Sequence, residues 1–388
     1  MAKRISESEA EREIKKFFGE DAVFFDGNID TIGKYEAIST GSPSLDEAIG
    51  IGGIPRGRIT QLAGKESSGK TMLSLSCIKS YLDENPNNTA LFIDAEYTYD
   101  PEWASSQGVD TSRVMVIKTN DARQIFEGLL GTVKVNSVTK KISKKMKGIL
   151  DYVEEGTDPR FKDLGIIVLD SIAVLNTPLE LAADIGKANM APIPRFLSTE
   201  LKKLTPQVAK ANVAFIGINQ VRVNLGQHFG DPATSPGGKA LKHACSLMIN
   251  MAPMFGADNL IKDKNDARIG HRVRAKVEKN KVGKPFQKAE YFVEYLKGVV
   301  NIEEEIFGLA LKYDLIERPN TQNYMIDGEK IRGRDAALES FSKNKPFMNS
   351  TQEKIREIYL GGGPAPAADN TPDDAEIEEN PLIMAMGQ

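Results

Sequence analysis

The sequence has few cysteines and no long apolar run, and both absences limit the class of protein. Only two of its 388 residues are cysteines, Cys77 and Cys245, in apolar stretches typical of a core helix and a core strand respectively. A structural disulfide is not expected, which favours a reducing compartment. No stretch reaches the roughly 18 uncharged apolar residues of a membrane helix, and the N-terminus is too polar for a signal peptide. We expect a cytoplasmic protein with no membrane partner.

The charge of the chain gives no general attraction to nucleic acid. Fifty basic and 54 acidic residues leave a formal net charge of −4, so any nucleic-acid site requires a local concentration of basic residues. Residues 361–388 contain six carboxylates and no lysine or arginine after a Gly-Gly-Gly-Pro segment, which predicts a disordered acidic tail. Such a tail either competes with any nucleic-acid partner for basic surface or only keeps the protein in solution.

Short apolar runs separated by helical segments predict an α/β core between residues 41 and 299, with a mostly parallel sheet covered by helices on both faces. Residues 1–40 are expected to form an N-terminal arm, residues 300–360 a small C-terminal α/β domain, and residues 361–388 the tail. The expected core strands are Arg58–Ala63, Ala90–Asp94, Val114–Lys118, Gly165–Asp170, Ala214–Asn219, Leu247–Met251, Val273–Lys281 and Lys288–Tyr295.

A phosphate-binding loop is the strongest local signal. The stretch from Gly64 to Thr71 fits G-x-x-x-x-G-K-[ST] and lies between a strand-like and a helical segment, which disfavours a chance match in a turn. Its backbone amides are expected to hold the phosphates of ATP, with Lys70 reaching the β- and γ-phosphates and Thr71 binding Mg²⁺. The full loop is Gly64, Lys65, Glu66, Ser67, Ser68, Gly69, Lys70 and Thr71.

Carboxylates at the ends of buried strands extend this site. Asp170 follows the run Ile166–Leu169, where open α/β sheets place ligands, and is expected to hold Mg²⁺; the alternative is an aspartate that caps the next element. Asp94 and Glu96 end another strand and are both candidates for the base that activates water. They share one face of the strand, so their spacing does not choose between them.

Seven segments match one family in order and spacing: Ile38–Gly50, Gly64–Thr71, Phe92–Tyr97, Ile218–Arg222, Phe229–Pro232, Gly237–Lys242 and Lys279–Lys281. Through them the chain resembles the bacterial RecA family over residues 14 to 360. Replicative helicases share the nucleotide loop but not the later segments, so the resemblance is specific.

The resemblance implies a role for each matching residue in ATP hydrolysis. Glu96 matches the base that activates water, and Gln220 the glutamine that senses the γ-phosphate. The positions that contact adenine are Asp100, Trp103 and Tyr295.

Lys279 and Lys281 match a pair that reaches the γ-phosphate of the neighbouring subunit and acts as arginine fingers do. Without the resemblance, both lysines would be interpreted as solvent-facing charges on a strand.

Two long loops match the DNA-binding loops of the family. Residues 178–195 correspond to the first loop, with Met190 wedging between bases and Arg195 contacting phosphate; residues 221–238 correspond to the second. Loops of this length in a compact domain are usually functional, although inert surface loops are the alternative. The residues of the second loop expected to contact DNA through its backbone are Arg222, Gly237, Gly238 and Lys239.

The chain also departs from the family. Pro192 and Pro194 are expected to stiffen the first loop, Asn224 replaces a positive residue, and His243 replaces a phenylalanine at the subunit interface. Residues 132–162 form an insertion rich in lysine, in which Val138–Tyr152 is expected to be a basic amphipathic helix. That surface is either an added DNA or partner contact or a solvated charged face, and the insertion suggests a diverged lineage such as a viral one.

The resemblance implies a DNA-dependent ATPase that needs ATP and Mg²⁺. It would assemble as a helical homopolymer on single-stranded DNA and exchange strands with homologous duplex DNA. Residues 12–25 resemble the polymerisation motif of the family; the alternative is a helix folded back on its own core. A filament scaffold that does not exchange strands and a ring-shaped helicase motor are the competing functions.

Overall fold

The computed structural model describes residues 35–135, 142–181, 192–220, 222–223, 233–234 and 238–361. The chain divides into a unit Met1–Glu36 and a unit Ala37–Gln388, and almost all described residues belong to the second. The polymerisation motif, the acidic tail, Met190 and Gly237 lie outside the described residues. Within the described ranges, each helix is too short or too polar to cross a bilayer.

A ten-stranded sheet forms the centre of the larger unit, and six of its strands run parallel. Their order is β12-β3-β9-β8-β4-β5, and each matches one of the predicted buried runs. The α/β fold with a mostly parallel sheet is therefore confirmed. The bounds of these six strands are β3 Arg58–Gly64, β4 Thr89–Asp94, β5 Val114–Lys118, β8 Leu164–Asp170, β9 Ala214–Gln220 and β12 Leu247–Pro253.

Four antiparallel strands continue the sheet beyond β12. β14 (Arg268–Asn280) pairs with β12, β15 (Lys288–Glu294) with β14, β16 (Gly298–Val300) with β15, and β13 (Leu260–Lys262) with the start of β14. β14 therefore returns along the sheet in the direction opposite to the parallel strands.

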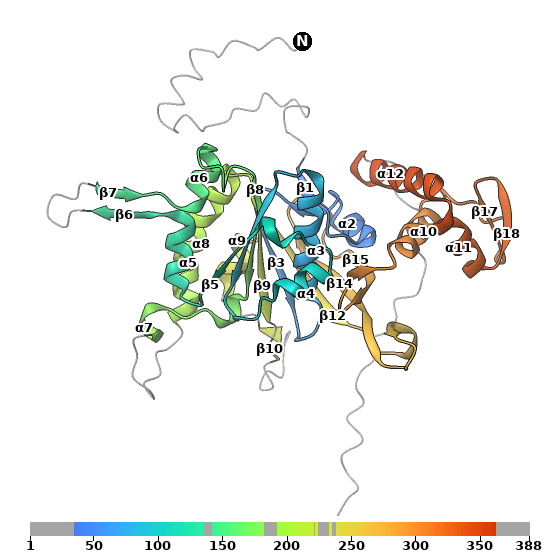
Figure 1. The fold of residues 1–388 in the computed structure, drawn as a ribbon, viewed down its shortest axis with the longest axis horizontal. Helices are drawn as coiled ribbons and strands as arrows, with labels where there is room; N and C mark the ends of the chain where they lie inside the picture. The colour runs from blue at the N-terminus through green and yellow to red at the C-terminus, as the bar shows by residue number, and fades with distance from the viewer. Residues whose placement is uncertain are drawn as a thin grey trace, which may run out of the picture. The chain divides into compact units, whose positions relative to one another are not determined.

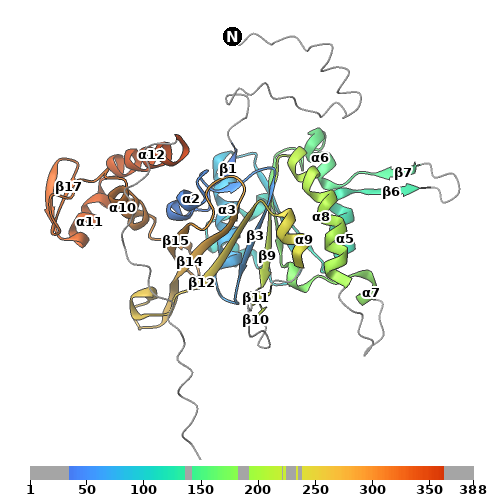
Figure 2. The same cartoon turned by 180° about the vertical axis from the view of Figure 1, so that it is seen from behind.

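Helices cover both faces of the sheet (Figures 1 and 2). Alternate strand residues point to opposite faces, so Leu62 and Phe92 join one apolar core while Ile59 and Leu91 join the other. The first core contains α2 (Pro43–Ile49), α3 (Lys70–Glu84) and α4 (Pro101–Ser106). The second contains α5 (Ala122–Leu130), α6 (Ile149–Glu155), α8 (Pro192–Lys210) and α9 (Gly238–Ala244).

Short elements connect these layers. β1 (Ala37–Ile38) pairs with β2 (Ile54–Pro55), and β10 (Arg222–Val223) pairs with β11 (Ala233–Thr234). The helix α7 spans Pro178–Leu181, and single 3₁₀ turns span Thr111–Arg113, Ile172–Val174 and Ala257–Asn259.

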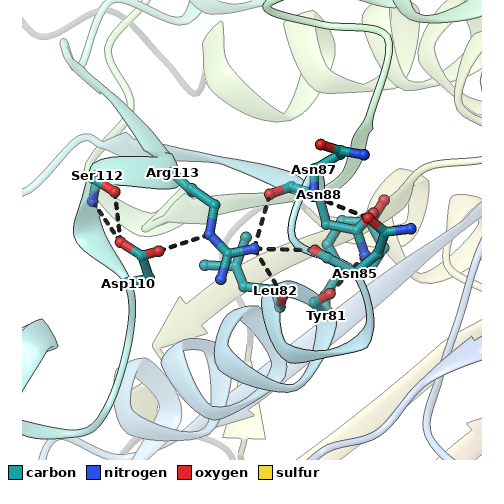
Figure 3. Close-up of polar contacts among 8 residues, drawn as sticks. All are labelled: Tyr81, Leu82, Asn85, Asn87, Asn88, Asp110, Ser112 and Arg113. Carbon is teal, nitrogen blue, oxygen red and sulfur yellow. Dashed lines mark hydrogen bonds and ion pairs between the residues drawn. The ribbon is translucent and has the colours of Figure 1, made fainter.

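An arginine distant in sequence caps the C-terminal end of α3 (Figure 3). The last turn of this helix has no basic residue of its own, and the guanidinium of Arg113 donates to the carbonyl oxygens of Leu82 at 2.8 Å and Asn85 at 3.1 Å. Asp110 orients Arg113 through a 2.7 Å ion pair. A cation at this end satisfies free carbonyls and complements the helix dipole, so it fixes the helix that begins at Lys70.

The residues after β16 pack around their own apolar cluster, which includes Phe307, Tyr324 and Phe341. The elements are α10 Ile302–Lys312, β17 Asn323–Ile326, β18 Glu329–Arg332, α11 Arg334–Lys343 and α12 Lys345–Gly361. The domain boundaries given above stay predictions.

Glu305 links α10 to the start of α2. Its carboxylate accepts from the Ser42 hydroxyl at 2.6 Å and from the Ser44 amide at 3.0 Å, so a residue of α10 caps a helix of the core. Burial raises the pKa of Glu305 to about 7, although these hydrogen bonds act in the opposite direction.

The predicted helix Val138–Tyr152 is wrong. β6 (Thr132–Val135) and β7 (Ile142–Met146) form an antiparallel hairpin, and α6 begins only after Gly148. The β-branched residues of this stretch favour strands. Gly148 ends the strand pairing, and its amide donates to Asp151 at 2.9 Å at the start of α6.

Two smaller expectations also differ from the structure. Cys245 follows α9 instead of lying in a strand, while Cys77 lies in α3 as expected; both are buried and free. Pro192 and Pro194 lie in the first turn of α8 instead of a loop. Proline is tolerated there because the first amides of a helix have no partner within it.

Candidate active site

The loop from Gly64 to Thr71 joins the end of β3 to the start of α3. A Cβ atom at Gly64 would lie 2.3 Å from the Met251 carbonyl oxygen, and Gly69 has a φ of 84°, so both positions require glycine. No side chain in the described chain caps the N-terminus of α3. The free amides of its first turn and its positive dipole end therefore form a site for an anion.

Lys70 folds back over this loop. Its Nζ atom donates to the carbonyl oxygens of Gly64 at 3.2 Å and Lys65 at 2.7 Å, and to the Ser68 hydroxyl at 3.3 Å. Burial lowers the pKa of Lys70, while the charge of Asp170 acts against that shift. The ammonium group thus lies beside the amides that would hold an anion.

Thr71 and Asp170 meet at the edge of the sheet. The Thr71 hydroxyl donates to the Asp170 carboxylate at 2.7 Å, and burial raises the pKa of Asp170 to about 6. One hydroxyl and one carboxylate are oxygen donors of the kind that bind Mg²⁺ together with phosphates and water, so these residues fit that ion.

Glu96 and Asp94 have different surroundings. Glu96 accepts a hydrogen bond from the Ser171 hydroxyl and a 3.4 Å hydrogen bond from the Gln220 amide. Asp94 is fully buried and accepts from the backbone amides of residues 98–99 at 3.0 Å each. Asp94 therefore holds a turn, whereas the partly exposed Glu96 lies beside Gln220 at the site.

The three residues expected to contact a base lie together. Asp100 caps α4 and accepts from the Trp103 amide at 3.3 Å. The Trp103 indole donates to the Tyr295 carbonyl oxygen at 2.7 Å. These contacts bring two aromatic side chains from distant parts of the chain to one place.

A buried histidine lies beside them that sequence analysis did not identify. The His271 ring lies 5.9 Å from the Tyr295 ring and 6.4 Å from the Phe255 ring, and it is only 2% exposed. Among the described residues, neither of its ring nitrogens has a hydrogen-bond partner. Burial lowers the pKa of His271, as does the nearby Arg268 charge, so the ring is held neutral and offers one donor and one acceptor.

The strand register places His271 on the face of the sheet that carries the phosphate loop. Val273 lies two residues further along β14, on the same face, and Val293 is the direct partner of His271 on β15. A Cβ atom at Gly69 would lie 3.6 Å from Val273 and 3.9 Å from Val293. His271 therefore lies between Tyr295 and the strand residues that pack against Gly69 of the phosphate loop.

Lys279 and Lys281 lie where the parallel strands begin, at the edge of the sheet opposite to the one where these strands end and the phosphate loop lies. Along β12, Met251 pairs with Gly64 at the phosphate loop, whereas Leu247 pairs both with Thr60 and with Asn280. These lysines therefore flank the beginning of β3, and the phosphate loop follows its end. The fold does not bring them to the phosphate loop of their own chain.

Lys281 lines a basic pocket of about 620 Å³ between α8, α9 and the start of β3. Among the described residues, no carboxylate lines it. The Lys279 ammonium, nearby on β14, donates to the Lys242 carbonyl oxygen at 2.5 Å, and burial together with the Lys281 charge lowers the pKa of Lys279. The polar and basic side chains that line the pocket are Arg58, Ser198, Lys202, Thr205, Lys239, His243, Ser246 and Lys281.

Of the predicted DNA contacts, Lys239 lines this basic pocket. Gly238 begins α9 with a φ of 63°, and Arg195 is exposed in the first turns of α8. Arg222 lies in β10, and its side chain is outside the described structure. Sequence analysis missed Ser198 and Lys202 because the pocket is assembled from separate segments and no local pattern connects them.

Comparison with known proteins identifies the family of the chain. The model of the RecA N-terminal domain matches residues 5–143 and 153–300, and the interval 144–152 falls within the expected insertion. Protein RecA of Borrelia duttonii (strain Ly) is 34% identical over 370 residues, which cover 95% of this chain and 92% of that protein.

Two further relatives match to a similar extent. Protein RecA of Allochromatium vinosum is 33% identical over 367 residues, 94% of this chain and 96% of the relative. Protein RecA of Leptospira meyeri is 32% identical over 347 residues, 89% and 81% of the two chains. Because the family model matches most of the sequence and these relatives are more than 30% identical over nearly all of it, the chain belongs to the RecA family.

Proposed function

We propose that this chain is a DNA-dependent ATPase that forms helical filaments on single-stranded DNA and exchanges strands with homologous duplex DNA. Membership of the RecA family supports a general role in recombination and repair. One structural observation carries the finer proposal: the nucleotide loop and Lys279–Lys281 occupy opposite edges of one sheet. A chain built in this way presents two halves of a site that only a neighbouring chain can combine.

ATP would bind with its phosphates on the amides of the Gly64–Thr71 loop and the N-terminus of α3. The Lys70 ammonium would exchange its contacts with loop carbonyls for the β- and γ-phosphates. Mg²⁺ would be held by the Thr71 hydroxyl and by Asp170, directly or through water, and would neutralise developing phosphate charge. Trp103 and Tyr295 would contact the base, and the unpartnered His271 would hydrogen-bond to the nucleoside, which relieves the cost of its burial.

Glu96 would accept a proton from the attacking water, because Asp94 is already engaged by backbone amides. Gln220 contacts Glu96 and is the last residue of β9, directly before the second DNA loop. A γ-phosphate that draws Gln220 away from Glu96 would move the start of that loop. Nucleotide state and DNA binding would thereby be coupled through one side chain.

Lys279 and Lys281 would stabilise the transition-state charge on the nucleotide of the adjacent protomer. They lie beside the beginning of the parallel strands, so this contribution is available only in trans. Full hydrolysis would then require the polymer.

Single-stranded DNA would run over the two loops and the basic pocket. Lys239 and Lys202 line that pocket with the hydroxyl of Ser198, a set suited to phosphate oxygens. Arg195, Arg222, Gly237, Gly238 and Met190 complete the proposed contacts. Binding through phosphates is insensitive to sequence, so homology would be tested by base pairing between the strands.

Polymerisation would use the edge strand β5. Within the described residues it pairs only with β4, and its Val116 and Ile117 are 36% and 39% exposed. Such an edge accepts an additional strand. The strand-like Ala22–Phe25 of a neighbouring chain would supply it, and a contact that does not close on itself yields an open helix.

The first experiment measures ATP hydrolysis with and without single-stranded DNA, followed by strand exchange between a labelled oligonucleotide and homologous duplex. We expect stimulated hydrolysis and exchange that depends on homology. Hydrolysis at full rate by an isolated protomer without DNA would contradict the proposal. Filaments without exchange would indicate a scaffold, and closed hexamers in electron micrographs a helicase motor. A cytoplasmic location stays a prediction.

A further inference from the structure

The hairpin of β6 and β7 is separate from the main sheet. Its two strands pair only with each other among the described residues, and the hairpin projects beside α5 and α6 (Figure 1). Its base is tightly closed: a Cβ atom at Gly131 would lie 2.2 Å from the Met146 carbonyl oxygen, and one at Gly148 would lie 2.3 Å from the Gly131 amide nitrogen. Two glycines therefore hold the ends of the hairpin in contact.

The hairpin carries a strong local positive charge on a chain whose net charge is −4. Residues 132–147 contain six lysines and neither aspartate nor glutamate. Lys147, at the base, is engaged by Glu155 at 2.5 Å. The remaining five are Lys134, Lys140, Lys141, Lys144 and Lys145.

The strand register places like charges opposite each other. Lys134 pairs with Lys144, and Val133 with Lys145. Like charges on directly opposite residues destabilise an antiparallel pair, and a lone two-stranded hairpin is marginal in water. A polyanion alongside the hairpin would offset both costs.

Duplex DNA fits this hairpin. The major groove of B-form DNA admits a two-stranded β-ribbon, and lysines bind its phosphates without reading sequence. Val133 and Met146 are each 51% exposed on the same ribbon and supply apolar contact near its base. The matched part of the RecA model omits residues 144–152, so part of this feature is outside the common core of the family.

We propose that the β6–β7 hairpin is an additional DNA-binding element that contacts the phosphates of duplex DNA through Lys134, Lys144 and Lys145. The proposal rests on the proposed function only in taking DNA as the polymer that the protein handles. It adds a contact outside the two loops and the basic pocket, which are assigned to the single strand. The hairpin is assigned to duplex DNA because a two-stranded ribbon fits the major groove.

The test replaces Lys134, Lys144 and Lys145 with glutamine in the full-length protein. Binding of a labelled duplex of arbitrary sequence is measured by fluorescence anisotropy over a range of NaCl concentrations. Loss of three phosphate contacts should reduce the slope of log affinity against log salt by about 3 and weaken binding about tenfold or more at low salt. The matched control removes three exposed lysines elsewhere, Lys262, Lys264 and Lys297, and should leave the slope unchanged.

A second variant keeps the test valid if the triple variant folds poorly. Deletion of residues 132–147 joins Gly131 to Gly148, which already touch, and should produce the same loss of duplex binding. An unchanged slope in both variants would overturn the proposal, as would an equal loss in the lysine control. Loss of binding to an acidic polypeptide with duplex binding intact would identify a protein partner instead.

The outcome is separable from that of the proposed function. Stimulation of ATPase by single-stranded DNA should survive in both hairpin variants. If the wild-type protein shows no such stimulation but the variants still lose duplex affinity, the proposed function fails and the hairpin proposal stands.

Discussion

The two edges of the parallel sheet differ in charge and in completeness. At the edge where the parallel strands end, Asp170, Glu96 and Lys70 surround a loop of free amides. At the edge where these strands begin, Lys279 and Lys281 lie beside a pocket that no carboxylate of the described residues lines. The anion site and the two lysines are therefore separated within one chain, which is the basis of the proposal that a site is shared between chains.

The largest effect is expected from inactivating each edge in a separate variant. Lys279→Ala with Lys281→Ala should reduce DNA-stimulated ATPase by about 10³-fold or more, as loss of an arginine finger does, and Lys70→Ala should also abolish it. Mixing the two inactive proteins should restore part of the rate, because some interfaces then combine an intact loop with intact lysines. Steady-state hydrolysis of the mixture measures this, and a mixture that stays inactive would contradict a shared site.

At the nucleotide edge, the contrast between two neighbouring carboxylates is the next largest effect. Glu96→Gln should lower kcat by about 10²- to 10⁴-fold while ATP still binds. Asp94→Asn is the matched control: it should lower the melting temperature through the turn at residues 98–99 and retain more of the rate. Single-turnover hydrolysis and nucleotide-binding assays distinguish the two, and a larger rate loss in Asp94→Asn would assign the base to Asp94.

A smaller effect should distinguish the two histidines that lie near opposite edges. His271→Ala should raise KM for ATP about two- to tenfold, the value of one hydrogen bond, with little change in kcat. His243→Ala, in the basic pocket, should leave KM unchanged. Replacing ATP with analogues altered in the base or ribose should reduce discrimination in the His271 variant alone, and an unchanged KM there would remove His271 from the site.

The last effect concerns stability and not catalysis, and it involves neither edge. Because the folded-state pKa of Glu305, about 7, lies above the ordinary value of 4.5, its contribution is fully present below pH 4.5 and is lost as the pH rises through 7. The wild type should lose roughly 2 to 3 kcal/mol of unfolding free energy over that range relative to Glu305→Gln. Urea denaturation at several pH values measures the difference, and parallel pH profiles would show that Glu305 does not titrate there.

Sequence patterns predicted the parts of this structure that depend on neighbouring residues. The buried runs became β3, β4, β5, β8, β9 and β12, since continuous apolar stretches suit strands covered on both faces. The loop between Gly64 and Thr71 was placed correctly between strand and helix. The helix predicted for Val138–Tyr152 is wrong because the β-branched residues of this stretch favour strands and Gly148 separates β7 from α6.

Features that depend on distant segments were not predictable in this way. The basic pocket unites Arg58, Ser198, Lys202, Lys239 and Lys281, which lie far apart in sequence. The cap of α3 by Arg113 and the unpartnered ring of His271 likewise arise from packing and strand register. The choice between Asp94 and Glu96 also required the three-dimensional structure, because only the fold shows which carboxylate accepts hydrogen bonds from backbone amides.

The strand β14 has a consequence for communication between chains. It is 13 residues long, with His271 near one end and Lys279 near the other, a span of about 27 Å at the usual rise of a strand. β14 is bonded to β12 along most of its length and to β15 over residues 270–276. If the proposed function holds, a nucleotide that shifts the first half of β14 would also shift the lysines offered to the next chain. Occupancy of one pocket would then be transmitted mechanically to its neighbour, and turnover along a polymer would proceed as a wave and not as independent events.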